Sequence, residues 1–212
     1  ILVFVTGPLA GVPVIGGSRW QVCGKSPAIE PATFCYGNFG GTWGAELKFA
    51  GYDALVVKGK STRPVYVYVR GTEVSLNDAS HLWGTGAVRT RHALKAELGH
   101  SVKVVAIGPA GENLAVMANL VADNDATGAM GLGAVMGSKM LKAIAVRRTA
   151  KHLNIAAPGQ LAELTRYYRS LDRSLAGVLG DIDFKVSGPN VSKDPCYGCL
   201  VNCLRVAYEA RN

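Results

Sequence analysis

The spacing of hydrophobic residues changes several times along the first third of the chain, and each change predicts an element. Short apolar runs separated by Gly-Pro, Gly-Gly and Ser-Pro pairs fill residues 1–41, which predicts strands and turns. A helix is expected at 43–50, because Gly51 supplies the usual C-terminal stop. The apolar run within 53–60 then predicts a buried strand.

The middle of the chain continues to mix strand and helix patterns. Residues 64–69 alternate valine with tyrosine, and 73–76 follow after a glycine turn, which predicts a hairpin. Apolar residues at helical spacing predict a helix over 86–98. Two further apolar runs predict strands at 103–107 and 143–146, with a glycine-rich loop at 128–137 between them.

The pattern becomes helical beyond residue 150. Apolar side chains recur there at i, i+3, i+7, i+10 and i+14, which is one face of an amphipathic helix: Leu161, Leu164, Tyr168, Leu171 and Leu175. We therefore expect an α+β fold, with a β-rich domain over residues 1–150 and the start of a helical domain over 151–212. The first residue is Ile1 and lies within an apparent strand, so part of the first domain is expected to precede it.

Composition narrows the class of protein. With 49% hydrophobic and 18% charged residues among 212, the chain can bury a sizeable core and is too apolar to be disordered. No apolar run reaches the roughly 18 residues of a membrane span. The formal charge of +8 is scattered rather than gathered into a stripe, so a phosphate-bearing cofactor explains it better than nucleic acid does.

Three of the five cysteines form a C-x2-C-x3-C run, namely Cys196, Cys199 and Cys203. Such clustering favours metal over disulfides, and hence a reducing, cytoplasmic compartment. The spacing favours a [4Fe–4S] cluster, which needs a fourth thiolate from elsewhere. Zinc, usually held by two separated pairs, and buried unliganded thiols remain alternatives. Cys23 and Cys35 are interpreted as small buried hydrophobes rather than as the fourth ligand.

A second candidate site lies in the glycine-rich residues 37–41, which include Asn38 and Gly40 and follow Lys25. Glycines let backbone N–H groups approach phosphate oxygens, an asparagine oxygen can bind a metal ion, and a lysine supplies positive charge. A phosphate cradle is one interpretation and a pair of structural turns is the other. The Walker and Rossmann spacings are both absent here. Trp20 and Trp43 are expected in the core.

Longer motifs carry a more specific signal than these glycines. They occur in the order TGPLAG, SRW, KSP, GAELKFAGYDALVVKGK, PVYVYV, IGPAGEN and GAVMGSK, followed by CYGC-x3-C. In this order they resemble the aldehyde ferredoxin oxidoreductase family over nearly the whole chain. The resemblance implies a β-rich base for two pterins that hold a tungsten or molybdenum atom. It also implies a [4Fe–4S] cluster beside one pterin and a Mg²⁺ ion that links the pterin phosphates.

The resemblance also implies roles for individual residues. Arg19 matches the family arginine between pterin and cluster, where a guanidinium can bridge two anions. Asn38 and Gly40 match the family's pterin loop, with Asn38 near the magnesium, and Ala126 matches the alanine whose carbonyl completes that site. The three clustered cysteines match three of the four cluster ligands: Cys196, Cys199 and Cys203. We expect the four cofactor residues to line one concave face, with the cysteines near Arg19.

One loop departs from the family. Where the family commonly reads H-R-A-A-G-R-G-G, residues 124–131 read N-D-A-T-G-A-M-G, so both arginines are lost and their phosphate contacts with them. The family's fourth cluster cysteine, catalytic acid and catalytic histidine find no match within the 212 residues. The chain by itself is therefore not expected to catalyse, and its catalytic residues stay unknown.

The resemblance implies part of an enzyme that oxidises aldehydes to carboxylic acids and passes electrons to ferredoxin or another electron-transfer protein. A homo-oligomer is compatible with it. One alternative is the tungsten subunit of an aryl-CoA or carboxylate-level reductase of the same family. Two others come from different classes: a non-catalytic zinc or iron–sulfur module, and a basic nucleic-acid binder.

Overall fold

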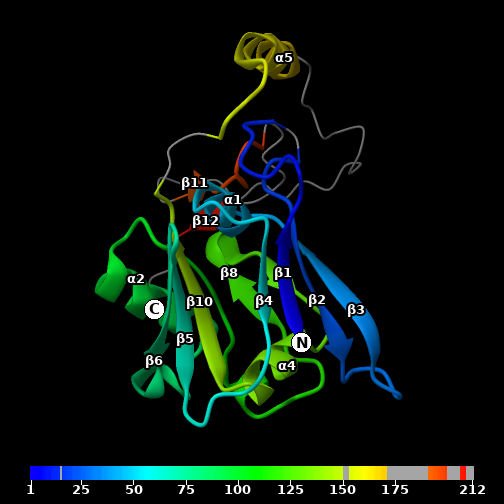
Figure 1. Ribbon diagram of the computed structural model, residues 1–212, viewed down its shortest axis with the longest axis vertical. Coiled ribbons are helices and arrows are strands. Elements are labelled where there is room, and N and C mark those ends of the chain that lie inside the picture. The colour runs from blue at the N-terminus through cyan, green and yellow to red at the C-terminus, as the bar shows by residue number, and fades with distance from the viewer. Residues whose placement is uncertain (15, 150–152, 171–190, 200–205, 209–212) are drawn as a thin grey trace.

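The structure, a computed structural model, describes residues 1–14, 16–149, 153–170, 191–199 and 206–208. Two β-sheets pack against each other, with helices at their ends and on one outer face (Figure 1). Buried side chains from both sheets form one hydrophobic core, including Leu2, Phe4, Val69, Ile144 and Val146. No helix among these residues is both long and apolar enough to cross a membrane.

The first sheet has four antiparallel strands in the order β3-β2-β1-β4. Alternate residues of each strand face the core, as a sheet with one buried face requires. At one end of the sheet, Thr6, Trp20 and Phe39 stand side by side on three strands. The strands are β1 (Leu2–Thr6), β2 (Trp20–Ser26), β3 (Thr33–Phe39) and β4 (Ala54–Val57).

The second sheet has six strands in the order β6-β5-β10-β7-β8-β9. Strand β10, near the centre of this sheet, is parallel to β5 and antiparallel to β7. It is buried on both faces over six consecutive residues. The strands are β5 (Val65–Arg70), β6 (Glu73–Asp78), β7 (Lys103–Ala106), β8 (Leu120–Ala122), β9 (Thr127–Gly128) and β10 (Leu141–Arg147).

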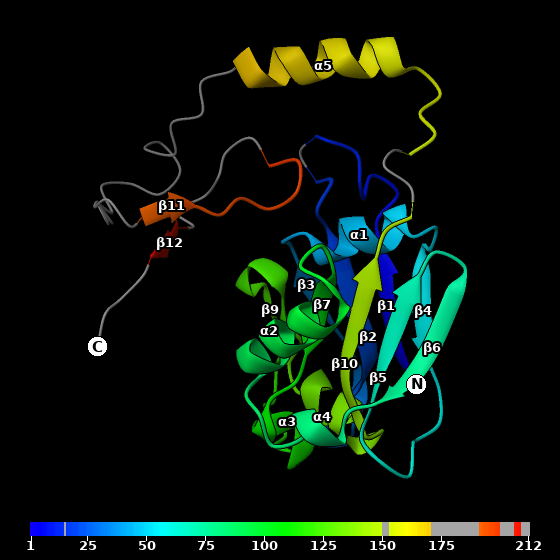
Figure 2. The same cartoon turned by 90° about the vertical axis from the view of Figure 1, so that its left-hand side faces the viewer.

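Helices close the two ends of the sandwich and cover the outer face of the second sheet (Figure 2). Helix α2 lies on that outer face. Its Leu94 packs with Val102, Val104 and Ala145 in a second hydrophobic core. The helices are α1 (Trp43–Phe49), α2 (Ala87–Leu98), α3 (Pro109–Glu112), α4 (Leu132–Ser138) and α5 (Pro158–Ser170), with 3-10 turns η1 (Ser80–Leu82) and η2 (Asp123–Asp125). A two-stranded antiparallel ribbon joins β11 (Val191–Lys193) to β12 (Val206–Tyr208).

The predicted α+β class is confirmed, with a β-rich first part. The helices expected at 43–50 and 86–98, the hairpin and the amphipathic helix near 158 are all present. The prediction of a glycine-rich loop over residues 128–137 is wrong, because helix α4 begins at Leu132 within this range. Leu171 and Leu175 lie outside the described residues, and the domain boundary near 150 stays a prediction.

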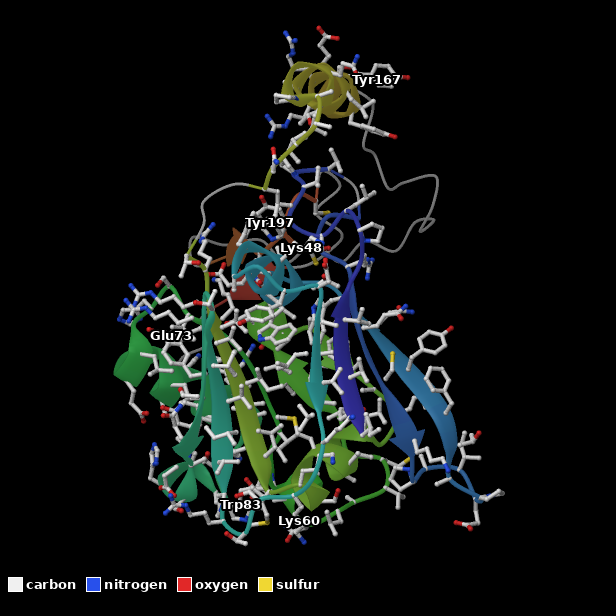
Figure 3. All side chains as sticks on the ribbon, in the orientation of Figure 1. Lys48, Lys60, Glu73, Trp83, Tyr167 and Tyr197 are labelled. Carbon is white, nitrogen blue, oxygen red and sulfur yellow. The ribbon has the colours of Figure 1, made fainter. Side chains whose placement is uncertain are left out.

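Helix α5 lies apart from both sheets in both orthogonal views (Figures 1 and 2). Its Tyr167 is exposed and extends sideways from the helix (Figure 3). Leu164, on the predicted apolar face, is exposed as well. Leu161 and Tyr168 on the same face are half-buried, so the described part of this face is only partly covered.

Four aromatic side chains fill the centre of the main core. The ring centroid of Trp20 lies 4.3 Å from that of Phe39 and 4.5 Å from that of Trp43, and Phe4 stands 5.8 Å from Trp43. The indole of Trp43 donates to the backbone oxygen of Ile144 at 3.2 Å, which joins α1 to β10 of the second sheet. Both tryptophans are therefore core residues, as expected.

One ion pair is enclosed entirely by protein. Lys142 donates to Glu112 and, at 2.7 Å, to the backbone oxygen of Thr85, while Glu112 accepts from the N–H of Gly84 at 2.8 Å. The two side chains are 0% and 3% exposed. Burial lowers the pKa of Lys142, and the hydrogen bond and charge of Glu112 oppose that shift. The ion pair therefore connects β10, which carries Lys142, to α3, which ends at Glu112.

A second buried acid links α1 to the end of β10. Glu46 accepts from the backbone N–H of Arg148 at 2.9 Å, and the guanidinium of Arg148 lies 3.5 Å away. Burial raises the pKa of Glu46, whereas the hydrogen bond and charge of Arg148 oppose the shift less strongly. The folded chain therefore retains a proton on Glu46 at pH values where the unfolded chain has released it.

We predict that Lys142→Met lowers the free energy of unfolding by about 3–5 kcal/mol, because it leaves the Glu112 carboxylate buried without its cation. The double variant Lys142→Met with Glu112→Gln should lose less, since the amide still accepts from Gly84 and carries no charge. Urea denaturation of the two variants checks this. A double variant as unstable as the single one would contradict the argument.

We predict that Glu46→Gln becomes more stable relative to the unchanged chain as the pH rises from about 4 to about 8. The raised pKa means that the contribution of Glu46 is complete below the ordinary glutamate pKa and is lost as the pH rises through the folded value. The measurement is urea denaturation at several pH values. Glu73→Gln, at an exposed position on β6, is the control and should show no such trend.

Candidate functional site

A hollow opens at the end of the first sheet where β1, β2 and β3 meet. It encloses about 600 Å³ and is lined by Val5, Thr6, Gly7, Arg19, Trp20, Gln21 and Asn38. Two of the four predicted cofactor residues therefore lie in one cavity, although Arg19 precedes β2 and Asn38 lies in β3. Gln21 donates to Oδ1 of Asn38 at 2.7 Å, which fixes the orientation of that amide.

Gly40 lies next to Arg19, which lines the cavity, and next to Cys196, the first of the three clustered cysteines. A Cβ built on Gly40 would lie 2.9 Å from Sγ of Cys196 and 3.8 Å from Nη1 of Arg19. Any larger residue would displace the thiol, so the glycine is needed for this close approach. The indole of Trp20 donates to the backbone oxygen of Gly40 at 2.9 Å and holds the loop in place. The guanidinium of Arg19, the thiol of Cys196 and the backbone of Gly40 thus lie close together.

Ala126 approaches the other side of the glycine loop. A Cβ built on Gly41 would lie 3.5 Å from Cβ of Ala126 and 2.5 Å from the backbone oxygen of Asp123. Gly41 also has a φ of +74°, which favours glycine. The carbonyl of Ala126 accepts from the N–H of Ala122 at 2.8 Å, and its second lone pair is available to a cation. The loop that carries Ala126 therefore abuts the loop that carries Gly40.

The first two cysteines occupy a turn against α1. The N–H of Cys199 donates to the oxygen of Cys196 at 3.1 Å, and the N–H of Tyr197 donates to the oxygen of Gly41 at 2.9 Å. The ring of Tyr197 meets Phe49 of α1 edge-on, with 5.5 Å between centroids (Figure 3). Cys203, the third predicted ligand, lies outside the described residues.

The donor types present suit the expected groups. Cys196 and Cys199 offer soft sulfur ligands, Asn38 and Ala126 offer hard oxygen ligands, and Arg19 offers fixed positive charge between them. Within the described ranges, no cluster of three or more histidine, cysteine or acidic side chains forms a complete metal site. The described residues therefore supply part of a ligand set.

Three residues considered from the sequence lie elsewhere. Lys25 is six residues along β2 from Arg19, roughly 20 Å away, and lines a separate hollow with Cys23. Cys23 pairs with Tyr36 and Cys35 with Gly24, so the two thiols point to opposite faces of the sheet. Cys35 is buried, as expected for a small hydrophobe, whereas the same prediction is wrong for Cys23, which is half-buried. Partial burial, with the charge of Cys35, raises the pKa of Cys23.

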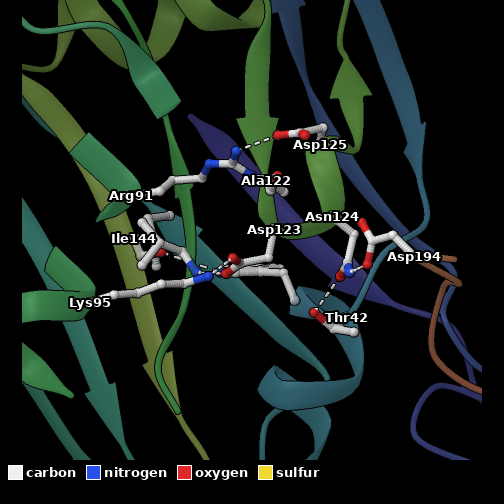
Figure 4. Close-up of polar contacts among 11 residues, drawn as sticks. Thr42, Arg91, Lys95, Ala122, Asp123, Asn124, Asp125, Ile144 and Asp194 are labelled. Carbon is white, nitrogen blue, oxygen red and sulfur yellow. Dashed lines mark hydrogen bonds and ion pairs between the residues drawn. The ribbon is translucent and has the colours of Figure 1, made fainter. Parts of the chain in front are cut away.

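Sequence reasoning missed a polar network beside the site (Figure 4). Thr42 donates to Asn124 at 2.7 Å, and Asn124 donates to Asp194. On the far side of the same loop, Lys95 pairs with Asp123 and Arg91 with Asp125. The sequence held one signal, since Asp123, Asn124 and Asp125 form a run of short polar residues that favours a turn.

Comparison with known proteins bears on the family. The family model described as "Aldehyde ferredoxin oxidoreductase, N-terminal domain" matches residues 1–148. The tungsten-containing aldehyde ferredoxin oxidoreductase of Pyrococcus furiosus is 48% identical over 147 residues, which are 68% of this chain and 24% of that protein. Its counterpart in Thermococcus kodakarensis is 49% identical with the same coverage.

One solved structure also resembles this chain. The active-site complex BamBC of benzoyl coenzyme A reductase, in complex with 1,5-dienoyl-CoA, has a chain that matches with a TM-score of 0.72 and 40% identity. The match covers 78% of this chain and 26% of that one. This chain spans about a quarter of the length of the curated relatives. The match over residues 1–148 shows that the chain belongs to the aldehyde ferredoxin oxidoreductase family, within its N-terminal domain.

Proposed function

We propose that this chain forms the cofactor-binding base of a tungsten-pterin oxidoreductase that oxidises aldehydes to carboxylic acids. Electrons would leave through a [4Fe–4S] cluster to ferredoxin or another electron-transfer protein, in the cytoplasm. The observation that carries the proposal is the meeting of Arg19, Gly40 and Cys196 at one point. The two archaeal relatives, whose names specify tungsten and ferredoxin, support it.

Arg19 is suited to lie between two anionic groups. Its guanidinium is planar, positively charged and carries five donors. One edge can therefore donate to a pterin while the other stabilises the negative charge of a cluster beside Cys196. The absence of a side chain at Gly40 lets Cys196 and Arg19 both approach its Cα, so a cluster held by Cys196 would lie beside the guanidinium.

Asn38 and Ala126 are suited to hold the magnesium ion. Mg²⁺ prefers oxygen ligands in a near-octahedral arrangement and keeps several waters. The amide oxygen of Asn38 accepts one hydrogen bond from Gln21, and the carbonyl of Ala126 accepts one from Ala122. Each oxygen keeps a lone pair for the cation. Because the ion would bridge phosphates, these two residues bind the phosphate end of the cofactor.

The cysteine turn is suited to hold one side of the cluster. Cys196 and Cys199 would ligate two irons, Cys203 a third, and the fourth ligand would come from outside this sequence. A bound metal–pterin would supply two-electron redox chemistry, and a bound cluster would supply one-electron transfer. The described residues bind and orient these groups, whereas the acid and base that act on the substrate are not among them.

A second candidate is a subunit that reduces an aryl-CoA or another carboxylate-level substrate. The likeness to the BamBC complex, at 40% identity, favours it. Both functions use the same base for the cofactor, so these 212 residues are compatible with either. Assaying a holoenzyme that contains this chain with an aldehyde plus oxidised ferredoxin, and with an aryl-CoA plus a strong reductant, distinguishes the two.

We predict that anaerobic reconstitution of the chain with iron and sulfide yields a cluster with an EPR signal after reduction. Cys196→Ser and Cys199→Ser should each lose most of the iron uptake, because a hydroxyl is a poor ligand for iron in such clusters. Cys23→Ser, on the outer face of the first sheet, is the matched control and should keep it. Tight stoichiometric zinc without iron uptake would favour a structural zinc module instead.

We predict that Asn38→Ala lowers the tungsten and pterin content of a holoenzyme that contains this chain by about 10-fold or more, because it removes an oxygen ligand of the bridging magnesium. Asn77→Ala, in an exposed hydrogen bond to Ser75, is the control. The readouts are metal analysis and pterin fluorescence. Full tungsten content in Asn38→Ala would argue against this placement of the cofactor.

A further inference from the structure

Asn124 lies where three separate segments of the candidate site meet (Figure 4). Its amide oxygen accepts from Oγ1 of Thr42 at 2.7 Å, and its amide nitrogen donates to Oδ1 of Asp194. Thr42 directly follows the Gly40-Gly41 pair, and Asp194 precedes Cys196 by two residues. One side chain thus joins the glycine loop, the loop of Ala126 and the cysteine segment.

The backbone at Asn124 is unusual. Asn124 has φ 59° and ψ 28°, and the next residue, Asp125, has φ 49°. A left-handed conformation costs roughly 1–2 kcal/mol for an ordinary residue and less for asparagine or aspartate. Both side chains of this pair are bonded, since Asp125 accepts from Arg91. The side-chain contacts therefore hold the chain in a turn that it would otherwise leave.

Helix α2 anchors the far side of this turn. Arg91 and Lys95 are one helical turn apart, and they pair with Asp125 and Asp123. Arg91 also donates to the backbone oxygen of Ala122, and Asp123 accepts from the N–H of Val104 at 2.5 Å. The loop is therefore fixed to the second sheet on one side. Asn124 projects from the other side toward Asp194.

We propose that Asn124 is a positioning residue that holds the cysteine turn against Gly40 and Arg19. The hydrogen bond to Asp194 acts together with the bond from Tyr197 N–H to the oxygen of Gly41. One of these hydrogen bonds holds the chain before Cys196, at Asp194, and the other holds it after Cys196, at Tyr197. Together they set the position of the Cys196 sulfur. The functional meaning rests on the proposed function, in which that sulfur ligates a cluster beside the pterin.

Exchanging the two partners tests the bond directly. Asn124→Asp keeps the oxygen that accepts from Thr42 but places a carboxylate opposite that of Asp194. In the double variant Asn124→Asp with Asp194→Asn, the new amide at 194 can donate to the new carboxylate at 124. The bond is then restored with its polarity reversed. Asn77→Asp, the same change in an exposed hydrogen bond, is the matched control.

The readout is the alkylation rate of each cysteine with iodoacetamide, resolved by peptide mass spectrometry. At a pH high enough to ionise thiols in every variant, Asn124→Asp should raise the rate at Cys196 by about tenfold, because repulsion between two carboxylates replaces a hydrogen bond and loosens the cysteine turn. The rate at Cys23 should not change, because Cys23 lies on the outer face of the first sheet, away from this loop. The double variant should return Cys196 toward the original rate.

An unchanged Cys196 rate in Asn124→Asp would overturn the proposal. So would an equal rise at Cys23, which would indicate general loosening, or a double variant as reactive as the single one. Reconstitution with iron and sulfide separates this proposal from the proposed function. If no cluster forms in any variant but the alkylation pattern holds, the positioning role stands and the iron–sulfur assignment fails.

Discussion

The hydrogen bond from the indole of Trp20 to the backbone oxygen of Gly40 connects the core to the candidate site. The ring is 1% exposed and packs between Phe39 and Trp43, so its N–H cannot move without disturbing the centre of the sandwich. Gly40, held at its oxygen, then presents a bare Cα to Arg19 and Cys196. A buried aromatic cluster thus fixes the backbone at the surface where the cofactor residues meet.

The loop after β8 lacks the two arginines of the family pattern that the sequence resembles. Positions 125 and 129 carry Asp and Ala where the family commonly has arginine. Asp125 instead pairs with Arg91, so the positive charge comes from a helix behind the loop. That pairing stabilises a left-handed turn at Asn124 and Asp125 and leaves Ala126 beside Gly41.

The same base is compatible with two kinds of reaction. Arg19, Asn38, Gly40 and the cysteine turn are suited to bind and orient anionic groups, and none of these tasks depends on which substrate is oxidised or reduced. A relative named as an aldehyde ferredoxin oxidoreductase and a structure named for benzoyl coenzyme A reductase accordingly match 68% and 78% of this chain. Substrate choice is then a property of the residues that would face the cofactor from the other side.

The sequence by itself determined the α+β class, most helices and strands, and the motifs that identify the family, because hydrophobic period, glycine stops and long motifs are local features. It could not place α4 within a glycine-rich run, since tertiary packing offsets the low helix propensity of glycine there. It also suggested Lys25 as a phosphate partner, but the strand register carries that residue away from Arg19. Only the tertiary structure could bring Asn124 to Asp194, because contacts between residues 70 positions apart depend on how distant segments pack.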